Sequence, residues 1–338
     1  MAAPISSTTS AERTDWLSLH AFYAADEDRL LVDGVAPLIR SLRERRLIER
    51  YFFIRYWLEG PHVRLRLRPA AGVAADDLAA EVETRIAAYL ARHPSADPVL
   101  PRQDTYRSMF LAEYGQASWD RRYGRDGHMP VRHNNTVRRE EYAPEYERYG
   151  GPAGIELAEW HFEVSSDLVL RLLADRSPQR RARLGLSAQL GLILCLTFLG
   201  DDARAAAFLD GYRDFWANAY GPAGADLSRM SGAASLTHAG PLRRRAEQIR
   251  ATLRAAGPDQ PAPGGWLTHC RLLRQQVAAL TAAGELEPPP GAPAGALPER
   301  LLHSYLHMTN NRLGVGVLEE AYLAGLLRTV LTGAGGAP

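Results

Sequence analysis

The spacing of the apolar residues changes once along this chain, close to Gly151. Before that point, short segments that alternate between apolar and polar residues, as strands do, are separated by segments with helical spacing. After it, helical spacing continues almost to the end of the chain. Because the two patterns occupy separate parts of the sequence, we predict an α+β protein. A sheet-containing half over residues 14–151 is expected to lead into a predominantly helical half over 152–332.

The sheet-containing half has the order β-α-β-β-α, which predicts a small, mainly antiparallel sheet with helices on one face. Its predicted strands are Trp16–Tyr23, Tyr51–Leu58 and His62–Arg68, and its predicted helices are Asp26–Leu47 and Ala74–Arg92. Helices of the second half are predicted over Ile155–Asp175, Gln179–Leu199, Asp202–Tyr220, Leu242–Ala256, Trp266–Ala283 and Leu297–Leu331. Residues 102–151 show no clear period, so we expect an irregular segment there, of a kind that is often functional. We expect a single domain over 14–338, preceded by a disordered tail at 1–13.

The composition is that of a globular protein, and it excludes several kinds of reaction and binding site. The 338 residues include 40 basic and 39 acidic ones, and a net charge of +1 offers no general attraction to nucleic acid or to an anionic membrane. All the basic residues are arginines, which excludes Schiff-base chemistry and lysine-containing phosphate loops. Cys195 and Cys270 are too few for a disulfide framework or a Cys-rich zinc site. The sequence has no dinucleotide-binding motif, so we expect no cofactor.

The sequence shows no targeting or membrane-spanning segment. Met1–Thr14 is small and polar and lacks the apolar core of a secretory signal. The longest apolar stretch, Leu184–Leu199, is interrupted by polar residues and is predicted to be too short to span a bilayer. We therefore expect a soluble, cytoplasmic protein in which this stretch is a buried helix.

The predicted strand His62–Arg68 carries the sharpest charge pattern in the sequence. Strand alternation places His62, Arg64, Arg66 and Arg68 on one face, and the apolar residues between them on the other. A guanidinium group binds a carboxylate or a phosphate with two parallel hydrogen bonds, so several on one face are suited to an anion. The alternative is a solvated face whose arginines pair with acidic residues of the same chain.

Histidines and polar residues also gather in the segment 302–314. His303 and His307 are one helical turn apart, a spacing that suits a metal ion, but the sequence has no intervening glutamate and no recognisable third ligand. A structural or an acid–base role is the simpler interpretation. Asn311 and Arg312 follow on a helix that is otherwise apolar. Because buried polar groups need partners, they indicate a polar pocket.

A third group of residues precedes the first helix of the helical half. Gly150 and Gly151 permit a tight turn, and Arg148 stands just before it. Arg148 either joins an anion site or pairs with Glu145 or Glu147.

Three separated motifs together resemble one known family. They are Tyr51–Tyr56 followed by Pro61–Arg66, then Glu147–Gly151, and finally His307–Leu313. In this order they are similar to the C-terminal domain of lantibiotic dehydratases, a family also described as thiopeptide-type bacteriocin biosynthesis proteins. The resemblance covers nearly the whole chain.

The resemblance implies a function in the biosynthesis of ribosomally made, post-translationally modified peptides (RiPPs). In this family the full-length enzyme transfers glutamate from glutamyl-tRNA to Ser or Thr of a leader-bearing precursor peptide. The C-terminal domain then eliminates glutamate and leaves dehydroalanine or dehydrobutyrine. A stand-alone chain is expected to act on the precursor peptide beside a separate glutamyl-tRNA-dependent dehydratase subunit, without binding nucleic acid or a membrane itself.

The resemblance also implies which residues form the site. Arg64, Arg66 and His307 match the family positions associated with elimination, and we expect them to be catalytic. The further candidates for substrate binding are His62, Arg68, Arg148, Asn311 and Arg312.

Two other functions of stand-alone relatives stay open. Pyridine synthases of thiopeptide pathways join two dehydroalanines in a formal 4+2 cycloaddition and release the leader, and an inactive member would only bind the leader peptide. Pro144 stands where elimination domains often carry an arginine, and Ser165–Ser166 replaces a common Asp-Ser pair. Residues 102–139 form a longer segment than in the fused domains, and we expect them to contribute a peptide-binding surface.

Overall fold

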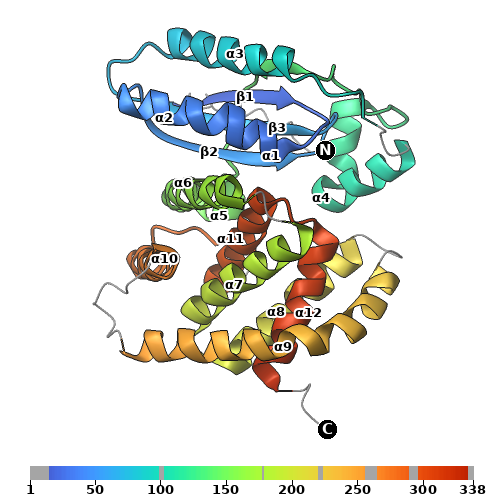
Figure 1. Ribbon diagram of the computed structural model, residues 1–338, viewed down its shortest axis with the longest axis vertical. Helices are drawn as coiled ribbons and strands as arrows, with labels where there is room; N and C mark the ends of the chain where they lie inside the picture. Colours follow the sequence, from blue (N-terminus) through green and yellow to red (C-terminus); the bar gives the residue numbers. More distant parts are fainter. Residues whose placement is uncertain are drawn as a thin grey trace, which may run out of the picture.

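The computed structural model describes residues 15–98, 103–176, 179–219, 224–255, 265–288 and 296–333. The tail predicted at residues 1–13 lies outside the described residues. A small sheet with its own helices packs on a larger group of helices (Figure 1). This arrangement confirms the predicted α+β class, in which a sheet-containing part precedes a helical one.

Four strands form one antiparallel sheet in the order β2-β3-β1-β4. The strands are β1 (Leu17–Phe22), β2 (Ile48–Tyr56), β3 (His62–Pro69) and β4 (Thr136–Arg139). The first three confirm the predicted strands. The fourth comes from the segment that was expected to be irregular, and it pairs with β1 at the edge of the sheet.

One face of the sheet is covered by helices (Figure 1). These are α1 (Glu27–Arg29), the π-helical η1 (Leu30–Val35), α2 (Ala36–Glu44) and α3 (Ala75–Arg92). Leu19, Leu65 and Phe53 lie in register on β1, β3 and β2, and all are buried in the same cluster as Leu31 and Val82 of the helices. Because alternate residues of a strand point to opposite faces, this packing turns the arginines of β3 to the other face of the sheet.

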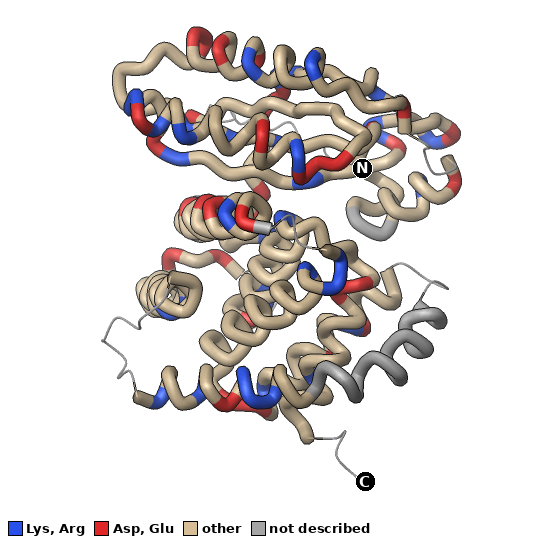
Figure 2. Tube along the Cα trace, in the orientation of Figure 1, with Lys and Arg blue, Asp and Glu red and all other residues tan. Residues whose placement is uncertain are grey.

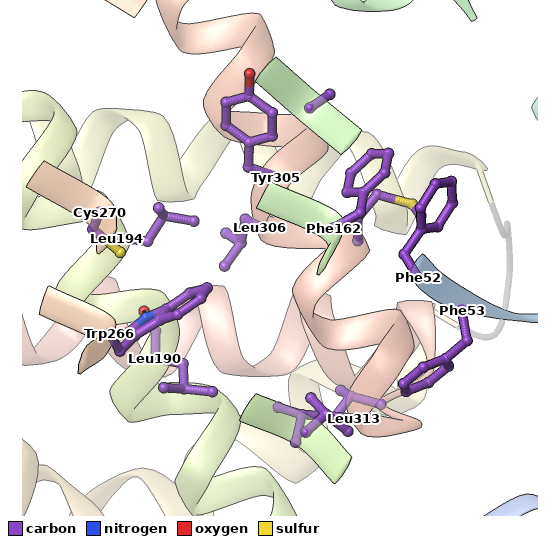
Figure 3. Packing of buried hydrophobic residues seen from close by; sticks show 14 of the residues in the cluster. Phe52, Phe53, Phe162, Leu190, Leu194, Trp266, Cys270, Tyr305, Leu306 and Leu313 are labelled. Atoms are coloured by element: carbon purple, nitrogen blue, oxygen red, sulfur yellow. The ribbon is translucent and has the colours of Figure 1, made fainter. Parts of the chain in front are cut away.

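The helical half packs against the β2 edge of the sheet. Its helices are α6 (Gly151–Arg176), α7 (Arg180–Leu199), α8 (Asp202–Ala219), α9 (Gly224–Ala255), α10 (Gly265–Ala283), α11 (Leu297–Leu313) and α12 (Val317–Thr332). One buried cluster runs through both halves, from Phe52 on β2 through Phe162 on α6 to Tyr305 on α11 (Figure 3). Charged residues of both signs alternate along the helices over the sheet, whereas the middle of the helical half carries few (Figure 2).

Helix α7 contains the apolar stretch predicted over Leu184–Leu199. With 20 residues it is long and apolar enough to cross a membrane, which corrects the expectation that this stretch is too short. Of its most apolar window, 67% is buried inside the protein, as predicted for a core helix.

The expectation of an irregular segment over residues 102–151 was wrong for much of its length. It contains β4 and two helices, α4 (Gln103–Tyr123) and α5 (Tyr146–Tyr149). The helical period of α4 is obscured because Gly115, at φ 76° and ψ 166°, kinks it. Phe110 and Trp119 of α4 also pack away from the main core, in a small separate cluster with Leu58 and Met129.

The single helix predicted over Leu297–Leu331 is two helices. Gly314 ends α11 in the left-handed region at φ 71°, where a side chain would be strained. A Cβ atom there would also lie 2.7 Å from the Arg183 guanidinium. The break allows α12 to change direction and pack mainly on α8 and α9, with Glu320 of α12 in contact with His307 of α11.

Candidate active site

A cavity of about 1110 Å³ lies where the end of β2 meets α4, α8, α11 and α12. Aromatic side chains form much of its wall, namely Tyr56 and Trp57 after β2, and Phe208, Tyr212, Phe215 and Trp216 of α8. The polar side chains in the wall include His303, His307 and Asn311 of α11 and Glu320 of α12. This volume is at the upper end of the range for small-molecule sites, so the cavity has room for a segment of peptide.

His307 is held in the cavity wall by a buried carboxylate. Its Nδ1 atom lies 3.0 Å from Oε1 of Glu320, whose side chain is fully buried. The Tyr212 hydroxyl and the Asn310 side-chain amide (3.2 Å) donate to the other carboxylate oxygen, Oε2. A carboxylate in this position favours the imidazole tautomer with hydrogen on Nδ1. The Nε2 atom of His307 then carries the lone pair, as a general base requires.

His303 lies one turn before His307 and also lines the cavity. Its ring packs against Tyr212 and Phe215, at 4.5 and 4.8 Å between ring centroids. Burial lowers the pKa of His303 to about 3, and the neighbouring His307 and Arg148 add to the effect. His303 is therefore neutral at physiological pH. In the described part of the chain, no three His, Cys, Asp or Glu side chains are grouped as metal ligands, and the two histidines remain a pair.

The arginine face of β3 begins beside the cavity. His62 donates from Nδ1 to the Gly60 carbonyl oxygen (2.8 Å) and accepts a hydrogen bond from Nε of Arg64 on its Nε2 atom (3.2 Å). This pairing holds the Arg64 guanidinium 3.4 Å from the centroid of the Tyr56 ring. Burial lowers the pKa of His62 to about 3, so His62 is a neutral acceptor that positions Arg64. Tyr56 itself belongs to the cavity wall.

Arg66 is a buried cation that forms no ion pair with the described residues. Its side chain is only 4% exposed, and among the described residues its Nε and Nη1 atoms have no hydrogen-bond partner. Its guanidinium lies 5.2 Å from the ring centroid of Tyr142, which is anchored to Glu159 by a 2.7 Å hydrogen bond. Burial, and then the charge of Arg64, lower the pKa of Arg66 to about 9. The group still carries its charge at neutral pH.

A sequence comparison identifies the family of the chain. The profile of the family described as "Lantibiotic biosynthesis dehydratase C-term" matches residues 16–331. The chain belongs to this family. No curated protein matches it in sequence.

Solved structures share the fold of this lantibiotic dehydratase C-terminal protein. It superposes on the pyridine synthase TbtD from thiomuracin biosynthesis with a TM-score of 0.70 and 19% identity, covering 95% of this chain and 98% of TbtD. For the tRNA-dependent lantibiotic dehydratase MibB from Microbispora sp. 107891, the TM-score is 0.54 and the identity 24%, over 97% of this chain but 29% of MibB. For TsrL the TM-score is 0.59 and the identity 16%, over 93% of each chain. The family places the chain among the proteins of RiPP biosynthesis, and the solved structures show that it shares their fold.

The structure brings only some of the predicted residues of this family member together. His307, Arg148 and Asn311 line one cavity, whereas Arg64 and Arg66 are not in its wall. Arg64 is next to the cavity, because its guanidinium packs on the ring of Tyr56, which lines the wall.

Arg148 and Asn311 each have partners within the protein as well. Arg148 donates to Glu145 (3.0 Å) and to the Ser304 hydroxyl (3.2 Å), so the pairing with Glu145 that was weighed from the sequence is present. Asn311 accepts from the main-chain N–H of Arg55 and donates to its carbonyl oxygen, at 3.0 and 2.8 Å. Asn311 thereby clamps the end of β2 to α11, beside Tyr56.

Arg68 and Arg312 lie away from the cavity. Arg68 pairs with Glu49 and Glu156, which is the solvated alternative for the strand face. Arg312 is fully buried, where it donates to Ser166 and to the Met308 carbonyl oxygen. The hydrogen bond to Ser166 links α11 to α6, so the structure gives Arg312 a role in holding these two helices together.

Glu320 and Tyr56 were not singled out from the sequence. Glu320 is the one charged residue among the buried residues of α12, and a buried carboxylate requires partners, which was a usable signal. Its contact with His307 depends on the break at Gly314, and the sequence pattern did not show that break.

Proposed function

We propose that this chain eliminates glutamate from glutamylated Ser or Thr residues of a RiPP precursor peptide and leaves dehydroalanine or dehydrobutyrine. The observation that carries the proposal is Arg66, a buried guanidinium whose Nε and Nη1 atoms have no partner among the described residues. A buried charge without an ion pair destabilises a fold. Arg312 offsets this with hydrogen bonds from Nε and Nη1 to Ser166 and Met308. The same two atoms of Arg66 have no partner among the described residues, so a ligand of opposite charge best explains Arg66. The departing glutamate supplies such an anion.

The chemistry requires a base for the Cα proton of the modified residue. Nε2 of His307 takes this proton, and the buried Glu320 carboxylate stabilises the imidazolium that forms. The electrons of the broken Cα–H bond form the Cα–Cβ double bond as the Cβ–O bond to glutamate breaks. Glutamate leaves with the bonding pair as a carboxylate.

The arginine face is assigned to the glutamate. Arg66 pairs with a carboxylate of the leaving group, and Arg64, held by His62, stands between that position and the cavity. Arg148 and Asn311 are at the cavity wall, where they contact the peptide. The partners proposed are the precursor peptide and a separate subunit that performs the glutamyl-tRNA-dependent step.

A second candidate function is pyridine synthesis from two dehydroalanines, with release of the leader. It is favoured by the size of the cavity, about 1110 Å³, and by its aromatic wall. A single glutamylated side chain fills only a small part of that volume, whereas two reacting segments of one peptide fill more of it. The third function, leader binding without catalysis, leaves the His307–Glu320 pair unexplained.

One experiment separates these functions. The protein is incubated with a glutamylated precursor and, separately, with a precursor that already contains two dehydroalanines. Elimination releases free glutamate and leaves each modified residue one water lighter than the original Ser or Thr. His307→Ala should slow this release by about 10²- to 10⁴-fold, so that the glutamylated peptide accumulates. A pyridine chromophore and a free leader, with no glutamate released, would establish the second function, and binding without any product would establish the third.

A further inference from the structure

Three arginines bind the C-terminal end of α11. The last carbonyl groups of a helix have no hydrogen-bond partner within the helix. Here three of them each accept from a different guanidinium, namely the carbonyl oxygens of Arg312 from Arg55 (3.0 Å), of Leu313 from Arg183 (2.8 Å) and of Gly314 from Arg180 (2.7 Å). Arg55 belongs to β2, and the other two arginines belong to the start of α7. Cations are favoured at this end of a helix by the direction of its dipole.

Asp28 lies between two of these arginines. Its Oδ1 atom accepts from Arg55 at 2.5 Å, and its Oδ2 atom accepts from Arg183. Burial by itself raises the pKa of the Asp28 carboxyl, but the hydrogen bonds and charges of the two arginines bring the pKa below its usual value, so Asp28 is ionised at neutral pH. The side chains of Asp28, Arg55 and Arg183 are only 8%, 11% and 12% exposed, so salt and water screen these ion pairs little.

The network joins the two halves of the protein at one turn. Asp28 is on α1 of the sheet half, and Arg183 is on α7 of the helical half. The turn itself is at Gly314, and a glycine permits many backbone conformations, so contacts from outside must set its angle. Arg180 adds a contact on the far side of the turn, because its Nε atom donates to Glu319 in the first turn of α12 at 2.6 Å.

This turn determines where Glu320 lies relative to His307. The two residues are on α12 and α11, and α12 packs mainly on α8 and α9. The 3.0 Å contact between Oε1 of Glu320 and Nδ1 of His307 therefore depends on the angle between the two helices at the turn. A displacement of about 1 Å in a catalytic arrangement can slow a reaction by about 10²-fold.

We propose that Asp28 is a positioning residue for the His307–Glu320 pair. By holding Arg55 and Arg183 on the end of α11, it fixes the turn and keeps the Glu320 carboxylate within hydrogen-bonding distance of His307. The inference rests on the proposed elimination, in which His307 is the base. Asp28 is not in the wall of the cavity, so it acts through the pair and not on the peptide.

The chain offers a matched control at a second junction between the halves. Asp167 of α6 accepts from Arg43 of α2 at 2.9 and 3.1 Å, and from the Tyr51 hydroxyl at 2.6 Å. This carboxylate also joins the sheet half to the helical half, but these partners are not part of the turn between α11 and α12. Asp28→Asn and Asp167→Asn each remove one charge and keep the shape of the side chain, so both variants should have a lower melting temperature than the wild type.

The experiment has two readouts, the kinetics of glutamate release and the proton NMR signal of the hydrogen on Nδ1 of His307, identified by its loss in His307→Gln. We expect Asp28→Asn to lower kcat by about 10- to 10²-fold with little change in KM, because the peptide still binds while the base is displaced. The Nδ1 signal should shift or broaden, because its carboxylate partner has moved. Asp167→Asn should keep the kcat and the signal of the wild type.

A second variant covers the case in which Asp28→Asn does not fold. The Arg180 side chain is 52% exposed, so Arg180→Gln is a surface change that removes the contacts with Gly314 and Glu319. It should lower kcat and shift the Nδ1 signal of His307 in the same direction, by a smaller amount. A wild-type kcat and signal in Arg180→Gln would count against the inference.

This inference and the proposed function fail separately. If the wild type releases glutamate and Asp28→Asn keeps its kcat, or if Asp167→Asn loses kcat to the same extent, Asp28 does not position the pair. If the wild type releases no glutamate, the proposed elimination is wrong, and the Nδ1 signal alone decides the role of Asp28. A signal that changes in Asp28→Asn but not in Asp167→Asn keeps the positioning of His307, and equal signals in the two variants overturn it.

Discussion

Replacing Arg66 with methionine should stabilise this protein while it disables the site. Methionine keeps most of the volume of the side chain and removes a charge that is 4% exposed and has no counter-ion within the described residues. Burial lowers the pKa of Arg66 to about 9, and the drop from its ordinary value corresponds to about 5 kcal/mol of destabilisation of the charged form. Exchanges of buried ions for apolar residues of similar size have stabilised other proteins by about 1–4 kcal/mol.

The expected effect on the melting temperature follows from the length of the chain. At about 2.1 cal/mol/K per residue, the unfolding entropy of 338 residues is about 0.7 kcal/mol/K. A gain of about 1–4 kcal/mol therefore raises the melting temperature by about 1.5–6 °C. Arg68→Met is the matched control, because Arg68 lies on the same face of β3 but is paired with Glu49 and Glu156 at the surface. Exposed ion pairs contribute little, so this variant should melt within about 1 °C of the wild type.

Adding glutamate tests whether the charge of Arg66 serves to bind an anion. Glutamate at concentrations well above its dissociation constant should raise the melting temperature of the wild type and of Arg68→Met, because a ligand that binds only the folded state stabilises it. It should leave Arg66→Met unchanged. A lower melting temperature for Arg66→Met in the absence of ligand would refute the reasoning, since Arg66 would then be a stabilising part of the core.

Two further predictions concern the buried histidines and their partners. Glu320→Gln should lower kcat for the modified peptide by about 10²-fold or more, because an amide does not stabilise the imidazolium that forms on His307 as a carboxylate does. An unchanged kcat would show that the pair is structural. Burial lowers the pKa of His62 and His303 to about 3 and that of His269 to about 4, against about 6.5 in an unfolded chain. Below pH 6.5 the unfolded state therefore binds more protons, so stability is lost as the pH falls, by roughly 1–2 kcal/mol per histidine at pH 5. Melting temperatures between pH 7.5 and 5 measure this, and a flat profile would contradict it.

The elements that the sequence predicted well are those whose apolar residues face one continuous core. In β3, Val63, Leu65 and Leu67 alternate with charged residues and are buried, so the strand and the face of its arginines followed from the pattern alone. In α4, the pattern failed because Gly115 kinks the helix and its aromatic residues pack in a second cluster. A local pattern reports which residues are buried, but it does not report that they are buried against a different core.

The site was harder to predict from the sequence than the fold, because its residues are far apart in the chain and are brought together only by tertiary contacts. The sequence identified the arginine face and His307 separately, but which of them share a cavity depends on the turn at Gly314 and on where β2 ends. The same turn places Glu320 beside His307, a contact between residues on two helices that the pattern joined into one.

The position of Tyr56 gives the two halves of the fold a shared function. The sheet half supplies cations, of which Arg64 and Arg66 lie outside the cavity wall, and the helical half supplies the His307–Glu320 pair inside it. A base and an anion site act on one substrate only if the substrate spans both. Tyr56 is in contact with Arg64 and also lines the cavity, so the proposed elimination requires the reacting residue to lie near Tyr56.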